Sequence, residues 1–294
     1  MTKNLNINPY YDNFDEAKNY HQILFRPGYS VQARELTQIQ SILKNQIAKF
    51  GNHVFKHGSV VIPGNTHSDQ YASYIKISGL LGETLSLSTF NNQVIVGETS
   101  GVRAIVKHSV ERDSSDPYVF YLAYISGGSN GNITFNLGET VHLELDTSKR
   151  VSISSDPDGI GFGTLAHINA GVYYVNETFV HVDRQTTVVD KFSSNPSARV
   201  MLRIDESFVG ALEDETLLDP AQGSYNYAAP GADRLKITLT LITVPLDAIE
   251  SDDYIELMRF REGVLEEHSR YPKYNELEKS LARRTYDESG AYLS

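Results

Sequence analysis

The sequence predicts a mainly β fold with a few helices. Apolar and polar residues alternate over most of its length, which is the period of a strand with one buried face. Glycine-, aspartate- and asparagine-rich turns separate these runs, and one long helical pattern spans residues 30–50. We expect an N-terminal arm and long helix, an antiparallel β-sandwich or barrel body with an inserted small β domain, and a C-terminal helix.

Composition excludes several classes of protein. The chain has 294 residues, enough for one large or two medium domains. Its net charge of −11 argues against a nucleic-acid-binding surface, which needs clustered basic residues. It contains no cysteine, so disulfides and thiolate metal sites are excluded. The sequence predicts no membrane insertion, because no apolar run is long enough, and its N-terminus does not resemble a signal peptide.

Residues 1–22 are polar and tyrosine-rich, with Pro9 among several asparagines. They predict an extended N-terminal arm that becomes ordered against a neighbour.

The segment 30–50 predicts an amphipathic helix of roughly 30 Å. Ser30 is the expected N-cap without a capping box, and Gly51 is the expected stop. The helix carries one apolar stripe, widened by Ile42 and formed by Leu36, Ile39, Leu43, Ile47 and Phe50. Two interpretations remain open: the helix packs on its own sheet, or it bundles with copies of itself, since Leu36, Leu43 and Phe50 share one heptad position.

Strands are expected at 54–62 and 71–77, where Ile75 and Ile77 share one face. Residues 80–150 read as an inserted small β-barrel or sandwich. The run 118–125 is apolar on both faces, which is typical of a buried strand. Alternation predicts further strands around Leu85 and Leu87, around Val102, Ala104 and Val106, and around Val141, Leu143 and Leu145.

The main helix-and-β domain is expected to comprise residues 23–79 and 151–294. Residues 154–163 read as polar and glycine turns that separate it from the insert. A hairpin turning at Asn176-Glu177 follows, and further strands are expected around 199–204, 235–241 and 254–260. A last helix is expected from Tyr274 to about Arg284.

The chain is poor in catalytic patterns, and we expect no enzyme activity, cofactor or metal site. His53 and His57 are four apart, but no further ligand follows at a suitable spacing. The loop aspartates do not follow the spacing of a calcium loop and read as turn residues: Asp113, Asp116, Asp156 and Asp158.

Several motifs resemble a family of tailed-bacteriophage virion proteins, usually described as a phage domain of unknown function (DUF4815). They begin with NPYYDNFD at 8–15 and LFRPGYSVQARELTQ at 24–38. They continue with GVYYVN at 171–176, DPAQG at 219–223, AAPGADRL at 228–235 and LARRTYDESG at 281–290. The resemblance implies a structural part of a contractile-type tail, in the baseplate or at the root of a fibre. It implies a location in the virion and brings no catalytic residue.

We therefore expect a non-enzymatic adaptor that binds other tail or baseplate proteins and forms a homo-oligomer, with a trimer favoured. An alternative is a receptor-binding module whose insert stacks Tyr118, Tyr121 and Tyr124 on a host glycan. A depolymerase is a third possibility, and it would need paired acids across a groove. The expected subunit or partner interface consists of Tyr10, Tyr11, Phe14, Phe25, Leu36, Ile39, Leu43, Ile47 and Phe50.

Overall fold

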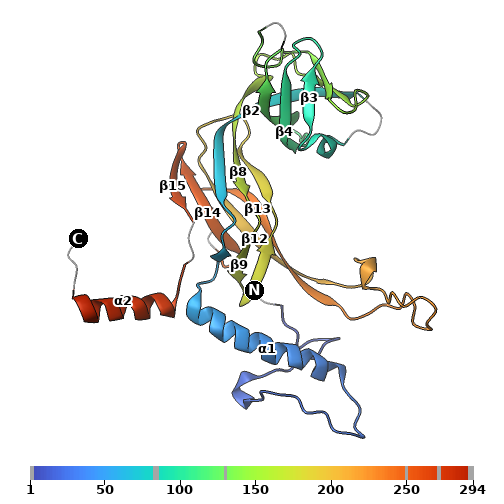
Figure 1. Ribbon diagram of the computed structural model, residues 1–294, viewed down its shortest axis with the longest axis vertical. Coiled ribbons are helices and arrows are strands. Elements are labelled where there is room, and N and C mark those ends of the chain that lie inside the picture. The colour runs from blue at the N-terminus through green and yellow to red at the C-terminus, as the bar shows by residue number, and fades with distance from the viewer. Residues whose placement is uncertain (1–2, 82–85, 129–130, 249–250, 270–272, 291–294) are drawn as a thin grey trace.

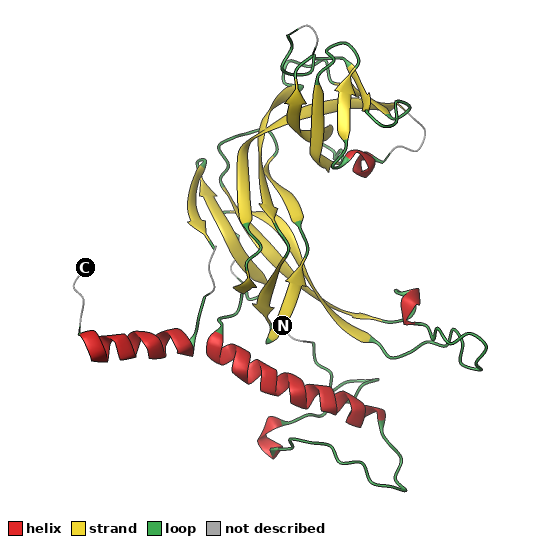
Figure 2. Cartoon of the chain, viewed as in Figure 1, coloured by secondary structure: helices red, strands yellow, loops and turns green. Residues whose placement is uncertain are grey.

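The computed structural model describes residues 3–81, 86–128, 131–248, 251–269 and 273–290. The molecule is elongated, with a small barrel at one end, packed sheets in the middle and two helices at the other end (Figure 1). Helix α1 (Ala33–Val54) lies early in the chain and helix α2 (Glu276–Ser289) lies late, while antiparallel strands make up most of the remaining elements. Figure 2 shows this dominance of strands, so the predicted mainly β fold is confirmed.

Within the described residues the strands form three sheets. The eight-stranded sheet has the order β11-β8-β2-β5-β4-β3-β6-β7, the three-stranded sheet β1-β9-β10, and the four-stranded sheet β13-β12-β14-β15. The eight strands are β2 (Thr66–Leu81), β3 (Val94–Gly97), β4 (Arg103–Val110), β5 (Tyr118–Ser126), β6 (Thr140–Leu143), β7 (Arg150–Ile153), β8 (Ile160–Ile168) and β11 (Gln185–Asp190). The other strands are β1 (Ser59–Ile62), β9 (Gly171–Val175), β10 (Thr178–Val182), β12 (Ala198–Val209), β13 (Arg234–Pro245), β14 (Tyr254–Arg261) and β15 (Val264–His268).

The barrel closes because β2 pairs with β7 as well as with β5. Strand β2 is long enough to serve two units: its first part pairs with β8 in the body, and its last residues, up to Leu81, pair with β7. Closure leaves β2, β3, β4, β5, β6 and β7 without a free edge around the barrel wall. Buried side chains fill the interior, including Phe90, Ile95, Val106, Phe120 and Val151.

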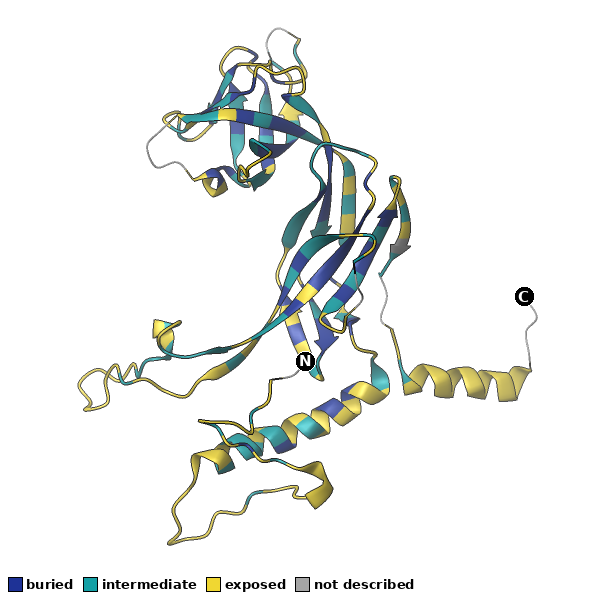
Figure 3. Ribbon diagram, turned by 180° about the vertical axis from the view of Figure 1, so that it is seen from behind, coloured by how far each residue is buried: buried dark blue, intermediate teal, exposed yellow. Residues whose placement is uncertain are grey.

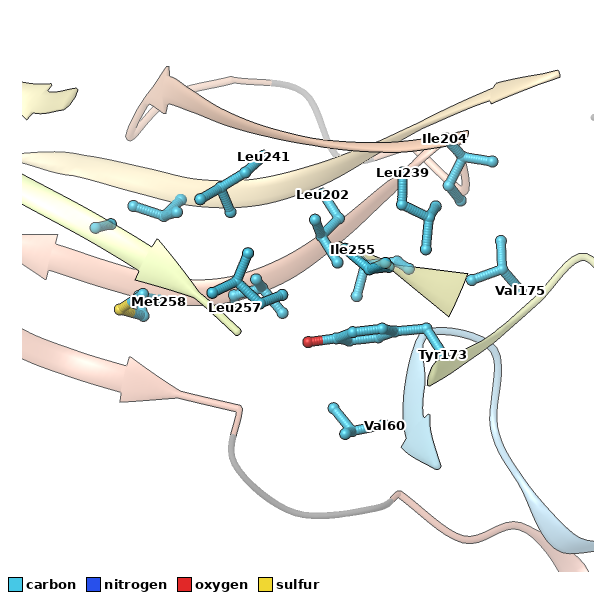
Figure 4. Packing of buried hydrophobic residues seen from close by; sticks show 14 of the residues in the cluster. Val60, Tyr173, Val175, Leu202, Ile204, Leu239, Leu241, Ile255, Leu257 and Met258 are labelled. Carbon is cyan, nitrogen blue, oxygen red and sulfur yellow. The ribbon is translucent and has the colours of Figure 1, made fainter. Parts of the chain in front are cut away.

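The body is a sandwich in which the four-stranded sheet packs against β8, β9, β10 and β11. Figure 4 shows Tyr173 and Val175 from β9 facing Leu202, Leu239 and Ile255 from the opposite sheet. This arrangement places a continuous apolar layer between the sheets, as expected for strands that alternate buried and solvated residues.

Several strand predictions are confirmed. Val200, Leu202 and Ile204 are buried on β12, and Leu239 and Leu241 are buried on β13. The β9–β10 hairpin turns at the predicted Asn176-Glu177, where both residues have positive φ, as a two-residue hairpin turn requires. In β5, residues 119–122 are buried, which agrees with a strand covered on both faces over that part, whereas Ile125 near its end is exposed.

Other local predictions are wrong. Leu87 begins the short 3-10 helix η2 (Leu87–Phe90) instead of lying in a strand, and Leu85 lies outside the described residues. Leu145 is 89% exposed, because β6 ends at Leu143. Residues 54–58 are not strand, because α1 extends to Val54. Two further 3-10 helices are η1 (Glu16–Lys18) and η3 (Glu215–Leu217).

The predicted glycine turn at 161–163 is instead the start of β8. Both glycines permit close packing rather than a change of chain direction. A Cβ atom at Gly161 would lie 2.8 Å from the Tyr74 hydroxyl, and one at Gly163 would lie 2.5 Å from the Lys191 carbonyl oxygen. Sequence alone does not separate this use of glycine from a turn, because the crowding atoms are distant along the chain.

A small third core joins the barrel to the body. Tyr74, Val119, Tyr121 and Leu165 are buried there together. Next to this core, the ammonium group of Lys191 lies 2.8 Å from Asp113 Oδ2 and 2.5 Å from Asp116 Oδ2. Because Lys191 follows β11 and the two aspartates lie in the β4–β5 loop, this pair of contacts holds the barrel loop against the body.

We predict that K191M loosens the β4–β5 loop without unfolding the protein. The hydrogen bond from Lys191 is the main cause that lowers the pKa of Asp113. The contact therefore contributes fully above the ordinary pKa of an aspartate, about 3.9, and is lost only as pH falls through the lower pKa of the folded state. Hydrogen exchange of residues 111–116 should become roughly three- to fivefold faster in the variant. K149M, which removes a 3.7 Å pair with Asp146 inside one turn, is the control. Equal exchange in the wild type and K191M would contradict the role of this contact.

Candidate assembly interface

Helix α1 begins two residues later than predicted. Gln32 is its N-cap, and Glu35 Oε2 accepts a hydrogen bond of 2.9 Å from the Gln32 backbone N–H, so the helix has the reciprocal contact of a capping box. The sequence prediction placed the cap at Ser30, and from that residue the capping-box position does not fall on Glu35. The predicted stop at Gly51 is also wrong, since α1 continues to Val54.

Gly51 lets α1 approach the sheet closely. A Cβ atom there would lie 2.5 Å from the ring and hydroxyl of Tyr174 on β9. The Tyr174 hydroxyl lies 3.1 Å from the Ala48 carbonyl oxygen and 2.9 Å from Asn52 Oδ1, and donates toward these acceptors. The Asn52 amide donates in turn to Glu177, at 3.1 Å. One face of α1 is thus fixed to the β9–β10 hairpin.

The N-terminal arm covers a second face of α1. Ser41 donates to the carboxylate of Asp12, which is buried, and Gln38 donates to Asn13 at 2.5 Å. Lys49 forms an ion pair with Glu16 of η1. Ile42 is only 7% exposed. The sequence prediction assigned Ile42 to the apolar stripe, but it lies on the face next to the arm.

The third face of α1 is apolar and uncovered. At about 100° per residue, its four large side chains fall within about 60° of one another around the helix. They are 52%, 60%, 50% and 67% exposed and are, in chain order, Leu36, Leu43, Ile47 and Phe50. We call these four residues the α1 stripe. Figure 3 shows α1 largely in the colour of exposed residues, with buried patches along its length.

The remaining predicted interface residues are scattered. Tyr10 packs on Phe208, with ring centroids 5.2 Å apart, and donates to Asp233 at 2.6 Å. That hydrogen bond is the main cause that raises the pKa of Tyr10. Tyr11 and Phe25 are exposed, whereas Phe14 and Ile39 are half-buried. The structure therefore groups the helix residues into one surface but does not bring Tyr10 into it.

Helix α2 has no buried residue among those described. The contacts between the described residues fix it at its start, where the Asn275 backbone N–H donates to the Val54 carbonyl oxygen at 3.0 Å and the Asn275 side chain donates to the Asn52 carbonyl oxygen at 2.9 Å. From this junction α2 runs away from the body (Figure 1) and exposes Leu281. It spans Glu276–Ser289, so it starts and ends later than predicted.

The residues considered for other chemistry have ordinary structural contacts. His53 lies in the last turn of α1, and His57 contacts the Asp252 carbonyl oxygen at 3.1 Å. In the described part of the chain, no three or more histidine, aspartate or glutamate side chains gather as metal ligands do. The same residues include no helix with the length and apolarity needed to cross a membrane. Of the three tyrosines considered for sugar stacking, Tyr121 is fully buried, and Tyr118 and Tyr124 are half-buried against the barrel core.

Comparison with known families matches the profile described as "Domain of unknown function (DUF4815)" to residues 8–79 and 151–294. The chain belongs to the DUF4815 family. The matched residues of this DUF4815 chain contain residues 8–22 of the arm, α1 with the α1 stripe, the sandwich and α2. The unmatched stretch, 80–150, contains β3, β4, β5 and β6 of the barrel. Comparisons with curated proteins and with solved structures found no match.

Sequence reasoning missed the residues that orient α1 in this DUF4815 chain. Asp12 and Tyr174 each hold one face of the helix, and Gly51 makes the second contact possible. A usable signal was the pair of small residues Ala48 and Gly51, which are three positions apart on one helix face and suit close packing. The stripe itself was visible, but nothing in its spacing distinguishes an uncovered face from a buried one.

Proposed function

We propose that this DUF4815 chain is a non-enzymatic structural adaptor of a phage tail, in the baseplate or connecting a fibre to it. The proposal rests mainly on the α1 stripe, and the resemblance of the flanking motifs to phage virion proteins supports it. The arm and the β9–β10 hairpin hold α1 on two faces and leave the stripe available for another subunit. The chain then works by symmetric, multivalent protein contacts, and a homotrimer is the favoured arrangement.

Covering the α1 stripe is energetically favourable. Fully burying one large apolar side chain stabilises by about 1.5–3 kcal/mol, so covering four half-exposed ones contributes several kcal/mol. Helix α2 supports the same conclusion, because isolated helices shorter than about 12–15 residues are marginal in water. It has 14 residues and no buried side chain of its own. One helix with an uncovered apolar face and a second helix without a buried side chain lie near one end of the molecule, as expected of a subunit that completes its packing in an assembly.

We predict that the purified chain is an oligomer and that L43E/I47E converts it to a monomer. Two carboxylates on the stripe would be buried without partners in the assembly, which is strongly unfavourable. Light scattering after size-exclusion chromatography gives the mass, and a trimer of the 32.8 kDa chain is expected. The control is L145E on the barrel, which makes the same Leu-to-Glu change at an 89% exposed site. A wild-type monomer, or a mass unchanged in L43E/I47E, would reject the stripe as the contact between subunits.

The location in a tail needs its own measurement. Purified tailed particles should contain the chain as a stoichiometric component, detectable by mass spectrometry and placed at the tail by antibody labelling. A chain found only in the unassembled fraction would reject the proposed location while leaving the oligomer result intact.

A further inference from the structure

The sandwich is open along one side. A groove of about 770 Å³ lies between β10, β13 and α1. Its lining includes Val180 from β10, Leu235 and Ile237 from β13, and Gln40 and Lys44 from α1. Val180 belongs to the sandwich core and Ile237 packs against that core, so the groove leads into the apolar layer between the two sheets.

Both strands beside the groove are edge strands. Strand β10 ends the three-stranded sheet, and β13 ends the four-stranded sheet. The side chain of Gln185 already pairs with β13 as a peptide group would. Its Nε2 donates to the Leu239 carbonyl oxygen and its Oε1 accepts from the Leu241 N–H, each at 2.8 Å. The outward backbone groups of Leu239 and Leu241 on this edge of β13 are therefore satisfied by one amide group that matches a peptide unit.

The alternation of a strand then shows which backbone groups face the groove. Since the Leu239 and Leu241 backbone groups point outward, those of Leu235 and Ile237 point the same way along the uninterrupted register of β13. On β10 the same reasoning applies. The Tyr174 carbonyl oxygen accepts from Gly58 N–H, so the backbone groups of Tyr174 point toward β1. The backbone groups of its two neighbours on β9 therefore point toward β10, where they pair with Thr178 and Val180. The backbone groups of Phe179 are left facing the groove.

The side chains beside this edge define the chemistry of a partner. On one face of β13, Leu235 and Ile237 are half-buried, and Ile237 packs against the core. On the other face, Arg234 and Lys236 are exposed, and Lys44 stands at the rim of the groove. A strand added to this edge would place its inward side chains beside the apolar pair and its outward side chains beside the basic pair.

We propose that an extended segment of a partner protein, with alternating apolar and acidic residues, adds as a strand to β13 at residues 234–238. Backbone hydrogen bonds supply the attachment, and the alternate side chains supply the specificity, as in other cases of strand addition. Exposed strand edges are usually blocked by charge, proline or a covering element, because they attract other strands. Here Gln185 covers one part of the edge and leaves the adjoining part open over a groove. This contact is separate from the α1 stripe.

The test uses a fluorescein-labelled peptide, Val-Glu-Val-Glu-Val-Glu-Val, titrated with the full chain and followed by fluorescence anisotropy. Saturable binding is expected below about 1 mM, and the matched peptide with lysine in place of glutamate should bind at least tenfold more weakly. R234E/K236E should weaken binding of the glutamate peptide at least tenfold. L43E/I47E should bind it as the wild type does, which separates this inference from the proposed assembly contact.

A pair of variants tests the backbone contact directly. L235P and L235A both lose the leucine side chain, but only L235P also removes the outward N–H. An edge strand tolerates proline at such a position, because the missing N–H makes no bond within the sheet. L235P should bind the glutamate peptide at least fivefold more weakly than L235A. If L235P does not fold, R234E/K236E remains decisive, because both side chains are exposed. The proposal is overturned by no binding of the glutamate peptide at 1 mM, by equal binding of the two peptides, or by unchanged binding in R234E/K236E.

Discussion

Replacing Glu139 by glutamine should lower the free energy of unfolding by about 2–4 kcal/mol, because it breaks a buried carboxylate network. Glu139 is 6% exposed. Its two oxygens accept hydrogen bonds from the backbone and hydroxyl groups of Thr99 and Ser100 and from the Asn136 backbone, at 2.6–3.2 Å. In E139Q an amide NH₂ group would face some of these donors. Urea unfolding monitored by circular dichroism measures the loss.

The matched control is E98Q, because Glu98 stands at the centre of the same Gly-Glu-Thr tripeptide at 97–99 as Glu139 does at 138–140. Glu98 is 35% exposed on its side chain and pairs with Arg150 at 3.3 Å. Loss of the Glu98 carboxylate should lower the free energy of unfolding by at most about 1 kcal/mol. Equal effects of E98Q and E139Q would contradict a special role for the buried carboxylate.

The effect of E139Q depends on pH in a definite direction. Burial tends to raise the pKa of Glu139, but the hydrogen bonds from Thr99, Asn136 and Ser100 outweigh it and leave the pKa below its usual value. For a carboxyl whose pKa is lower in the folded state, the contribution is full above its unfolded pKa, about 4.3, and is lost as pH falls through the folded value. The difference between wild type and E139Q should therefore be constant near neutral pH and shrink below about pH 4.

Gly51→Ala should destabilise the protein by about 1–3 kcal/mol, although the same change inside an exposed helix stabilises by about 1 kcal/mol. The reversed sign comes from Tyr174, whose ring and hydroxyl would lie about 2.5 Å from the new Cβ atom. To relieve the clash, α1 must move off the β9–β10 hairpin and lose the hydrogen bonds from Tyr174. Thermal unfolding gives the sign, and hydrogen exchange in α1 shows whether the helix loosens.

Gly79→Ala is the control for the change at Gly51, since no atom lies within 4 Å of a Cβ placed there. It should change the free energy of unfolding by less than about 0.5 kcal/mol. If Gly51→Ala raises the melting temperature, the close contact between α1 and Tyr174 is not the one that positions the helix.

Much of the fold was predictable because it depends on local alternation. Residues 235–241 predicted β13, and Asn176-Glu177 predicted the β9–β10 turn, since neighbouring residues decide both features. Barrel closure was not predictable in this way. It depends on pairing between Leu80 and Val151, which are far apart in sequence and carry no mutual signal in a single chain.

The candidate interface was predictable to a similar extent. The spacing of Leu36, Leu43, Ile47 and Phe50 identified one helix face, and these four residues do share an exposed surface. The positions of Tyr10 and Ile42 were not predictable, because the folded arm decides them. Tyr10 reaches Asp233, more than two hundred residues away along the chain, and Ile42 is buried on the face that the arm covers.

Strand β2 pairs both in the barrel and in the body, and this has a consequence for the order in which the two units fold. Thr66 pairs with Ile168, and almost the whole barrel sequence lies between them. Joining two chain segments across so long an unfolded loop is entropically costly and slow. Pairing of β2 with β5 and β7 shortens that loop and brings the start of β8 next to β2 before the body forms. We therefore expect the barrel to form first and the sandwich to close on it, so that a variant that slows barrel formation should delay the folding of both units.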